Sequence, residues 1–530
     1  MKYINNPILK GFNPDPSICR VGDDYYIATS TFEWFPGVQI HHSKDLKNWK
    51  VIAQPLNKLS QLEMKGVPDS CGVWAPCLSY DKGTFYLVYT NVKSFDGVWK
   101  DTPNYIVTTE DILGEWSDPI YLNSGGFDGS FFHDDDKTWF TNMLVDHRGA
   151  KFFGGVELQE YNKETKKLEG EVYYLTSGTK LGLTEGPHIY KRNNYYYLIL
   201  AEGGTEYGHA ASILRSKNLT GPYIEHPQNP ILTCRNHPEH PIQKAGHASL
   251  TETKNGDWYI TFLVGRPLTS LGRCTLGRET AIEEIIWKDD WPMLKTETNL
   301  PRIKIPLPNL EEHSYNALPI KNDFNSSKLS LIFQSLRIPK SKNWMSLTER
   351  PGFLRLKGKE SLSSMHTQAL LARRLQHTQA EVSTCIEFEP ENFQQMAGLI
   401  IYYNTGHYHY LYITKNGTDK LISIISSNNF VTWEQEERIQ ITGTKRVVLK
   451  ATINKQELQF GYNLNETDTN FKNIGNSLDM SLLSDDNVRE GSERYRPAFT
   501  GSFVGMCCQD LKTNNKHADF DWFAYKELNT

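Results

Sequence analysis

Short aromatic and β-branched runs recur along the first 300 residues, each preceded by turn-forming residues. They begin near Asp23 (DDYYIATS), Lys82 (KGTFYLVYT), Asp135 (DDKTWFTNM), Asn193 (NNYYYLILAEGG) and Asn255 (NGDWYITFLVGR). Runs of this composition bounded by turn residues are typical of β-strands. Their spacing of roughly 50 to 60 residues matches the length of one four-stranded propeller blade.

A second pattern, a polar turn followed by an aromatic residue, comes after the first in three of the repeats. It reads HSKDLKNW at residues 42–49, TEDILGEW at 109–116 and RSKNLTGPY at 215–223. Because the two patterns recur in the same order, they predict a five-bladed β-propeller over residues 1–300. The alternative is a large β-sandwich with aromatic strands.

The pattern changes after residue 300. Four prolines between Thr296 and Pro319 and the lack of clear periodicity predict a linker over residues 301–320 that follows the protein surface. Strand patterns then resume, for example in AGLIIYY at 397–403, and predict a β-sandwich over residues 321–530. The predicted fold class is therefore all-β, a five-bladed propeller followed by a concanavalin-like sandwich.

The charge composition argues against two classes of binding partner, nucleic acids and membranes. The net charge of −5 over 530 residues gives no basic surface for nucleic acid or membranes. The sequence shows neither an apolar stretch of about 20 residues nor an apolar signal segment, so we expect a cytoplasmic protein.

The eight cysteines show no metal-ligand spacing and predict no disulfide framework. We also expect a homo-oligomer.

Three acids stand at similar places in the repeats, just ahead of aromatic strands. They are Asp15 in NPDPS, Asp128 in GFDGS and Glu185 in TEGPH. Since propeller blades place corresponding positions around one central channel, these acids should converge there. Convergent carboxyls suit cleavage of a glycosidic bond, in which one acid protonates the leaving oxygen and another activates water or attacks directly. A third can raise the pKa of the acid by like-charge repulsion.

Each candidate also has a purely structural interpretation. The acids taken singly could be ordinary turn residues. His247 could orient a carboxylate, bind a metal or satisfy a hydrogen bond in the core, and Arg278 could bind a sugar or an acid, or pair with Glu279. Trp74 could stack on a sugar ring or pack between blades. Phe32 and Phe127 are further candidates for stacking on the apolar face of a sugar.

Six motifs in order, NPDPS, VWAP, GFD with a following HDDD, EGPH, AGHAS and LGRET, resemble the inverting glycoside hydrolases of family 43. The two-domain β-xylosidases, some of which also cleave α-L-arabinofuranosides, are the most similar members. The resemblance extends over essentially the whole chain, including DFDWFAY near its end. It implies an exo-acting enzyme that releases D-xylose from the non-reducing end of short β-1,4-xylo-oligosaccharides.

The resemblance also implies residue roles. Asp15 is expected to be the general base, Glu185 the general acid, and Asp128 the residue that tunes and orients the acid. Residues expected to bind substrate or shape the pocket are Phe32, Trp74, Phe127, His247, Arg278 and Phe499. Phe499 would come from a loop of the sandwich that closes the mouth of the site.

The sequence departs from the expected pattern at Gly129, where a proline would be expected after Asp128. Glycine leaves the backbone freer, so Asp128 should be held less rigidly than Asp15. No cofactor is expected to be required and no metal ligands are assigned, although a divalent cation such as calcium is compatible with the sequence. An α-L-arabinofuranosidase and a non-catalytic sugar-binding propeller are the alternatives.

Overall fold

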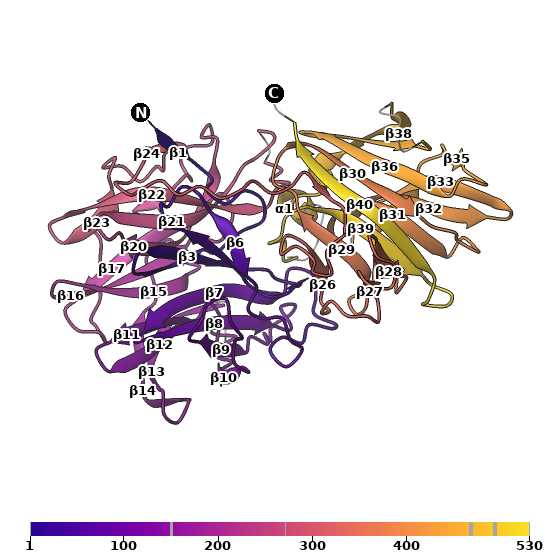
Figure 1. Ribbon diagram of the computed structural model, residues 1–530. Helices are drawn as coiled ribbons and strands as arrows, with labels where there is room; N and C mark the ends of the chain where they lie inside the picture. Colours follow the sequence, from indigo (N-terminus) through magenta and orange to yellow (C-terminus); the bar gives the residue numbers. More distant parts are fainter. Residues whose placement is uncertain (1, 149–151, 271, 466–469, 491–495, 529–530) are drawn as a thin grey trace.

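The computed structural model describes residues 2–148, 152–270, 272–465, 470–490 and 496–528 (Figure 1). Within these ranges nearly all regular structure is β-strand, and the helical elements are η1 (Met480–Leu482) and α1 (Asp485–Arg489). No helix in this part of the chain is long and apolar enough to cross a membrane. The all-β prediction is confirmed.

The first part of the chain forms five antiparallel sheets in succession, the blades of the predicted propeller (Figure 1). Each predicted aromatic run forms the second strand of its sheet. Blades one to three are β2 (Ser17–Val21), β3 (Asp24–Thr29), β5 (Gln39–Ser43), β6 (Lys50–Ala53); β7 (Gly72–Asp81), β8 (Thr84–Val92), β9 (Asn104–Thr109), β10 (Ile120–Asn123); and β11 (Ser130–Asp134), β12 (Lys137–Val145), β13 (Phe153–Asn162), β14 (Lys167–Thr176).

Blades four and five complete the ring. They are β15 (Glu185–Arg192), β16 (Tyr195–Glu202), β17 (Ala210–Ser216), β18 (Ile224–Glu225), β19 (Leu232–Thr233); and β20 (Gln243–Glu252), β21 (Trp258–Gly265), β22 (Arg278–Lys288), β23 (Trp291–Leu294). In both blades the first two strands form a hairpin at the position that the aromatic pattern predicts.

The two ends of the propeller segment are tied together. Strand β1 (Tyr3–Asn5) pairs with β24 (Lys304–Pro306), which lies in the segment predicted to be a linker. Ile4 and Ile305 from these strands are buried in one cluster with Ile27 of blade one and Ile282 of blade five. This apolar cluster closes the ring between the first and last blades.

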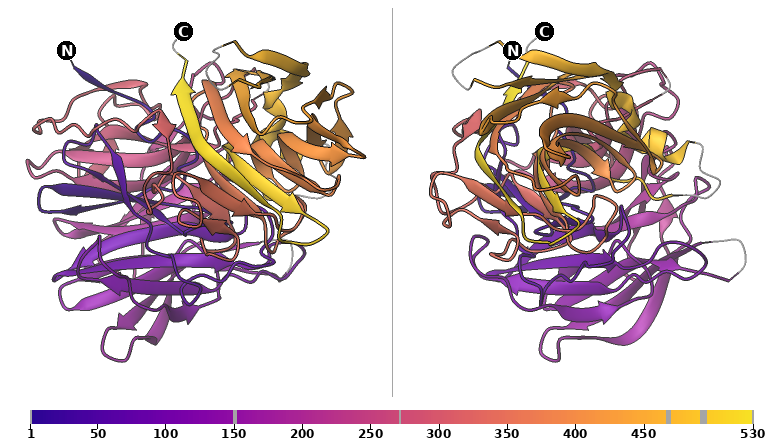
Figure 2. Two further views of the ribbon diagram at one scale, coloured as in Figure 1. Left: turned by 45° about the vertical axis from the view of Figure 1, so that its right-hand side comes forward. Right: turned by 90° about the vertical axis from the view of Figure 1, so that its right-hand side faces the viewer.

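The second part of the chain is a sandwich of two large antiparallel sheets (Figure 2). Their facing sides enclose a continuous apolar core. One sheet holds β25 (Lys321–Asn322), β27 (Met345–Ser346), β28 (Leu354–Lys357), β30 (Gln379–Glu387), β36 (Arg446–Asn454), β37 (Glu457–Asn463), β38 (Lys472–Asp479) and β40 (His517–Glu527). The other holds β26 (Gln334–Leu336), β29 (Ala369–Arg374), β31 (Gln395–Asn404), β32 (His407–Asn416), β33 (Asp419–Asn428), β34 (Val431–Glu434), β35 (Ile439–Gln440), β39 (Phe503–Asp510) and also β4 (Trp34–Phe35).

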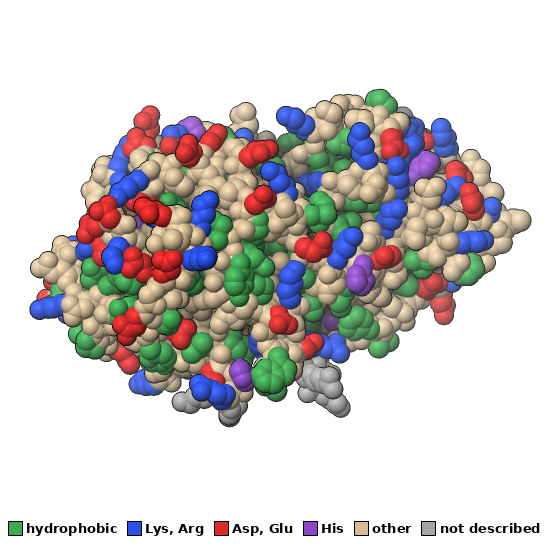
Figure 3. All heavy atoms as spheres, turned by 90° about the horizontal axis from the view of Figure 1, so that it is seen from below, with side chains coloured by type: hydrophobic (Ala, Val, Ile, Leu, Met, Phe, Trp, Pro, Cys, Tyr) green, Lys and Arg blue, Asp and Glu red, His purple; other side chains and the backbone are tan. Residues whose placement is uncertain are grey.

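The strand β4 comes from the propeller segment and joins the propeller to the sandwich. It pairs with β26, and the ring of Trp34 stacks on Phe503 at 3.6 Å. Around this contact, side chains of both parts form one buried apolar cluster. The propeller and the sandwich therefore share a core that fixes their relative position. The outer surface seen in Figure 3 carries basic and acidic side chains interspersed, in agreement with the small net charge.

Candidate active site

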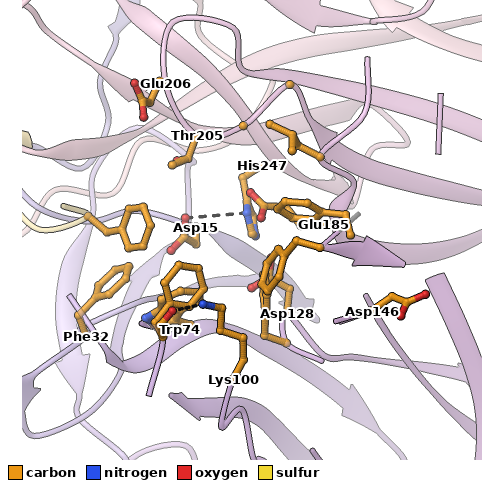
Figure 4. Close-up of a pocket in the computed structure, with 18 of the residues that line it drawn as sticks. Asp15, Phe32, Trp74, Lys100, Asp128, Asp146, Glu185, Thr205, Glu206 and His247 are labelled. Atoms are coloured by element: carbon orange, nitrogen blue, oxygen red, sulfur yellow. Dashed lines mark hydrogen bonds and ion pairs between the residues drawn. The ribbon is translucent and has the colours of Figure 1, made fainter. Parts of the chain in front are cut away.

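A cavity of about 660 Å³ opens where the propeller meets the sandwich (Figure 4). Its size lies within the usual range for small-molecule sites. All nine residues singled out from the sequence line it: Asp15, Phe32, Trp74, Phe127, Asp128, Glu185, His247, Arg278 and Phe499.

The acids lie at or just before the start of the first strand in blades one, three and four. Asp15 and Asp128 lie two residues before β2 and β11, so a short strand separates each of them from the aromatic run that follows. Glu185 is the first residue of β15, and His247 lies within β20, the strand that precedes the aromatic run of the fifth blade. The aromatic pattern marked one strand in each blade, the second, and therefore did not predict these first strands separately.

The backbone at the site is strained. Asp15, Phe32, Asp128 and His247 have φ values of 54°, 51°, 56° and 46°. Residues other than glycine rarely adopt this left-handed region, which costs about 1–3 kcal/mol at each position. Such residues cluster where the surrounding structure holds side chains in functional directions.

Breaks in strand register also aim side chains at the cavity. The ladders shift between Trp74 and Cys77, between Glu185 and His188, and on both sides of Gly246. A bulge of this kind bends the strand and redirects the residues beside it. Trp74, Glu185 and His247 thus reach the cavity from strands whose other residues build the blades.

Asp15 sits among hydrogen-bond donors. Its Oδ2 accepts from the Ser30 hydroxyl at 2.6 Å, and its Oδ1 accepts from Arg278 Nη1 at 3.2 Å. His247 Nδ1 lies 3.9 Å from the same Oδ1 (Figure 4). Burial opposes the charge, but the Arg278 guanidinium and the Ser30 hydroxyl hold the pKa of Asp15 below its usual value. Asp15 is therefore ionised at neutral pH.

Asp128 and Glu185 have the opposite character. Burial and the nearby charge of Asp15 raise the pKa of Glu185 to about 8. Burial, Glu185 and Asp15 also raise the pKa of Asp128, whose Oδ2 accepts a hydrogen bond from the Gly186 N–H at 3.1 Å. Carboxyls this close share their protons as a pair. At neutral pH Glu185 therefore keeps its proton while Asp15 is ionised.

Aromatic rings form one wall of the cavity. The ring centroid of Trp74 lies 5.3 Å from both Phe127 and Phe499, and Phe32 lies 5.8 Å from Phe499. The Phe499 N–H donates to Ser70 Oγ at 3.0 Å, and its carbonyl accepts from Arg278 Nη2 at 3.1 Å. Because Phe499 belongs to the sandwich, its contact with the pocket favours a closing role for that part of the chain over a carbohydrate-binding module.

Several residues of the site gave no signal in the sequence. The Ser30 hydroxyl accepts from the Ala75 N–H at 2.7 Å, which directs its own proton to Asp15. Thr205 Oγ1 accepts from Arg278 Nη1 at 2.7 Å. Glu279, the alternative partner of Arg278, instead pairs with Arg266. Further lining residues are Phe95, Gly97, Val98, Lys100, Asp146, His147, Phe152, Phe153, Leu183, Gly203, Gly204 and Glu206.

One group of side chains has the spacing of metal ligands. Ligand atoms of Asp128, Glu185 and His247 all lie within 4.8 Å of one another. Burial lowers the pKa of His247, so its imidazole is neutral and able to coordinate. Metal ligands must, however, be deprotonated, whereas the pKa values of both carboxyls are raised. A cation bound directly to Glu185 would displace the proton that this residue must donate as the general acid.

The arrangement defines a class of enzyme. An ionised carboxylate and a protonated carboxyl in one aromatic-lined cavity can activate water and protonate a glycosidic oxygen. These are the two functions that a glycoside hydrolase requires.

Comparison with known proteins agrees with this class. Residues 4–292 match the model of glycosyl hydrolases family 43, and residues 321–526 match the beta xylosidase C-terminal concanavalin A-like domain. The chain belongs to glycosyl hydrolases family 43, as its motifs predicted.

Individual relatives are similar over their full lengths. The chain is 49% identical to a beta-xylosidase of Bacillus subtilis (strain 168), with 99% of each chain covered. It is 48% identical to xylosidase/arabinosidase 43B of Humicola insolens, with 100% of this chain and 98% of that one covered. The crystal structure of xylan beta-1,4-xylosidase from Bacillus halodurans C-125 superposes with a TM-score of 0.96 at 50% identity, covering 99% of this chain and 100% of that one.

Proposed function

We propose that this enzyme is an exo-acting, inverting β-xylosidase that releases D-xylose from the non-reducing end of short β-1,4-xylo-oligosaccharides. The observation that carries the proposal is the opposite shift of two carboxyl pKa values in one cavity, Asp15 downward and Glu185 upward. The similarity to a Bacillus subtilis beta-xylosidase supports the choice of sugar.

In the proposed reaction Asp15 takes a proton from water while the water oxygen attacks the anomeric carbon. The bond from that carbon to the glycosidic oxygen breaks, and Glu185 gives its proton to the leaving oxygen. Arg278 keeps Asp15 ionised before the reaction and, with Phe499 and Thr205, positions the sugar edge. Asp128 holds the Gly186 N–H beside the acid and so fixes the direction of Glu185.

A second activity, removal of α-L-arabinofuranosyl groups, is supported by the similarity to xylosidase/arabinosidase 43B of Humicola insolens. Both substrates present a terminal pentose to the cavity. We therefore include an arabinofuranoside in the test of the proposed function.

We further propose that hydrolysis requires no metal, because the raised pKa values of Asp128 and Glu185 oppose direct coordination. Exhaustive treatment with EDTA should then leave kcat/KM unchanged. A loss that is restored by calcium would contradict this.

The function is tested by the hydrolysis of 4-nitrophenyl β-D-xyloside, xylobiose and 4-nitrophenyl α-L-arabinofuranoside, with the product anomer followed by NMR. We expect α-xylose to be the first product from xylobiose. Asp15→Asn should lower kcat by roughly 10²- to 10⁴-fold, the usual contribution of a general base. Retention of configuration would overturn the assigned mechanism, and sugar binding without turnover would favour a binding protein.

A further inference from the structure

An exposed aromatic residue lies at the outer rim of the cavity. Trp99 is 69% exposed, and its ring centroid lies 4.7 Å from that of His147. His147 lines the cavity, as do Val98 and Lys100 on either side of Trp99, whereas Trp99 itself lies outside the lining. An exposed apolar side chain continuous with a binding cavity indicates a contact for ligand.

Aromatic side chains also line the way from the acids toward this rim. Phe95 lies 5.1 Å from Trp74 and 5.8 Å from Phe152. The ammonium group of Lys100 lies over both phenyl rings, at 4.4 and 5.5 Å from their centroids. Figure 4 shows Lys100 and Asp146 on the same side of the cavity as Trp74 and Asp128. A sugar chain leaving the acids by this route passes aromatic surface before it reaches Trp99.

The loop that carries Trp99 connects β8 to β9 and is held by its own hydrogen bonds. At its base the Lys93 N–H donates to the Asp101 carbonyl at 2.9 Å, and the Asp101 N–H donates to Ser94 at 3.2 Å. Within the loop Lys100 Nζ donates to the carbonyls of Phe95 and Gly97. Trp99 is therefore presented on an ordered turn.

His147 is held in a comparable way between β12 and β13. The residues on either side of it, Asp146 and Arg148, form a two-point ion pair at 2.9 and 3.1 Å. A surface that is ordered before the ligand arrives loses less conformational entropy on binding. The turn that carries Trp99 has this property.

We propose that Trp99 and His147 form an additional subsite for the leaving part of the substrate. This subsite receives the third sugar ring, counted from the non-reducing end at which xylose is released. The inference rests on the proposed function. The cleaved xylose occupies the space around the acids, the second ring passes Phe95 and Phe152, and the third ring packs its apolar face on Trp99. Xylotriose reaches this subsite and xylobiose does not.

The test compares the ratio of kcat/KM for xylotriose to kcat/KM for xylobiose in three proteins. In Trp99→Ala the ratio should fall about two- to tenfold, as loss of one aromatic packing contact implies. Phe393→Ala is the matched control, because Phe393 is also 69% exposed but belongs to the sandwich. The ratio of the two kcat/KM values in this variant should equal that of wild type. An unchanged ratio in Trp99→Ala would overturn the subsite.

A binding measurement separates this inference from the proposed function. Calorimetric titration of Asp15→Asn with xylotriose and xylobiose reports the subsite without turnover, and adding Trp99→Ala should weaken xylotriose binding selectively. Absence of xylose release by wild type would refute the proposed function alone, while equal affinities with and without Trp99 would refute the subsite. A change in molecular mass of Trp99→Ala by sedimentation would assign the rim to a subunit contact instead.

Discussion

Asp15 and Glu185 are carboxylic acids that line the same cavity, yet their neighbours shift their pKa values in opposite directions. Asp15 accepts hydrogen bonds from Ser30 and Arg278, which favour its charged form. Glu185 is buried beside the charge of Asp15, which favours its neutral form. A base and an acid are thus obtained from similar side chains by their environment alone.

A bell-shaped dependence of kcat/KM on pH follows from these shifts. Activity should fall as pH rises through about 8, because Glu185 must be protonated to act as the acid. It should fall on the acid side only below the usual pKa of aspartic acid, because Asp15 must be ionised. Initial rates with 4-nitrophenyl β-D-xyloside across the pH range measure both limbs.

Ser30→Ala tests the origin of the acid limb. Loss of the Ser30 hydroxyl removes a hydrogen bond that favours ionised Asp15, so the acid limb should move to higher pH while the alkaline limb stays in place. Ser212→Ala, a buried serine of β17 outside the cavity lining, is the control. An unmoved acid limb in Ser30→Ala would show that the hydroxyl does not tune the base.

At the scale of strands, the site depends on irregularities in otherwise regular blades. The ladder between β20 and β21 shifts on both sides of Gly246, next to His247. A Cβ atom added at Gly246 would lie 2.2 Å from Cδ2 of the buried His209 ring. The absence of a side chain at Gly246 therefore allows the strand to approach His209 and to direct His247 toward Asp15.

Gly246→Ala should accordingly lower both stability and activity. Overpacking at a buried position costs about 1–3 kcal/mol, and displacement of β20 should reduce kcat through His247. Urea denaturation and kcat measurement test this. The matched control is Gly125→Ala, since a Cβ there would have no atom within 4 Å. Equal stability of the two variants would mean that His209 moves aside without cost.

The sequence pattern predicted the aromatic strands and the acids because both depend on local composition. Turn residues next to Asp15, Asp128 and Glu185 mark the ends of strands, and the propeller fold then brings strand ends together. Ser30 and Thr205 could not be found in this way, since their roles depend on contacts with Ala75 and Arg278 that are distant in sequence. The first strands of blades one and three were missed because each has only five residues and lies between an acidic turn and the longer aromatic run that was used to mark the blade.

At the scale of the whole molecule, a buried ion pair joins the propeller to the sandwich. Lys244 Nζ of β20 lies 2.7 Å from Asp485 and 3.1 Å from Asp486, and the Lys244 side chain is fully buried. Burial opposes its charge, but the two acids raise the pKa of Lys244 above its usual value. The helix α1 that carries these acids precedes Phe499 in the chain, so the contact helps to hold the closing loop.

Lys244→Met should destabilise the protein by about 3–5 kcal/mol, because it leaves two buried carboxyls without their cation. Arg438→Ala provides the contrast: the Arg438–Glu434 pair is 45% and 42% exposed, and its loss should cost below about 0.5 kcal/mol. Chemical denaturation measures both. A Lys244→Met protein as stable as wild type would show that the acids become protonated at little cost.

The strand β4 has a consequence for biosynthesis. Phe35 and Ser335 are joined in one ladder although they lie 300 residues apart, so β4 finds its partner only after most of the chain has been made. Until then the apolar side chains of Trp34 and Phe35 lack the part of their buried surroundings that the sandwich supplies. A ribosome-bound propeller thus reaches its final packing only when the sandwich has been synthesised, and cutting the chain between the two halves would expose the cluster that they share.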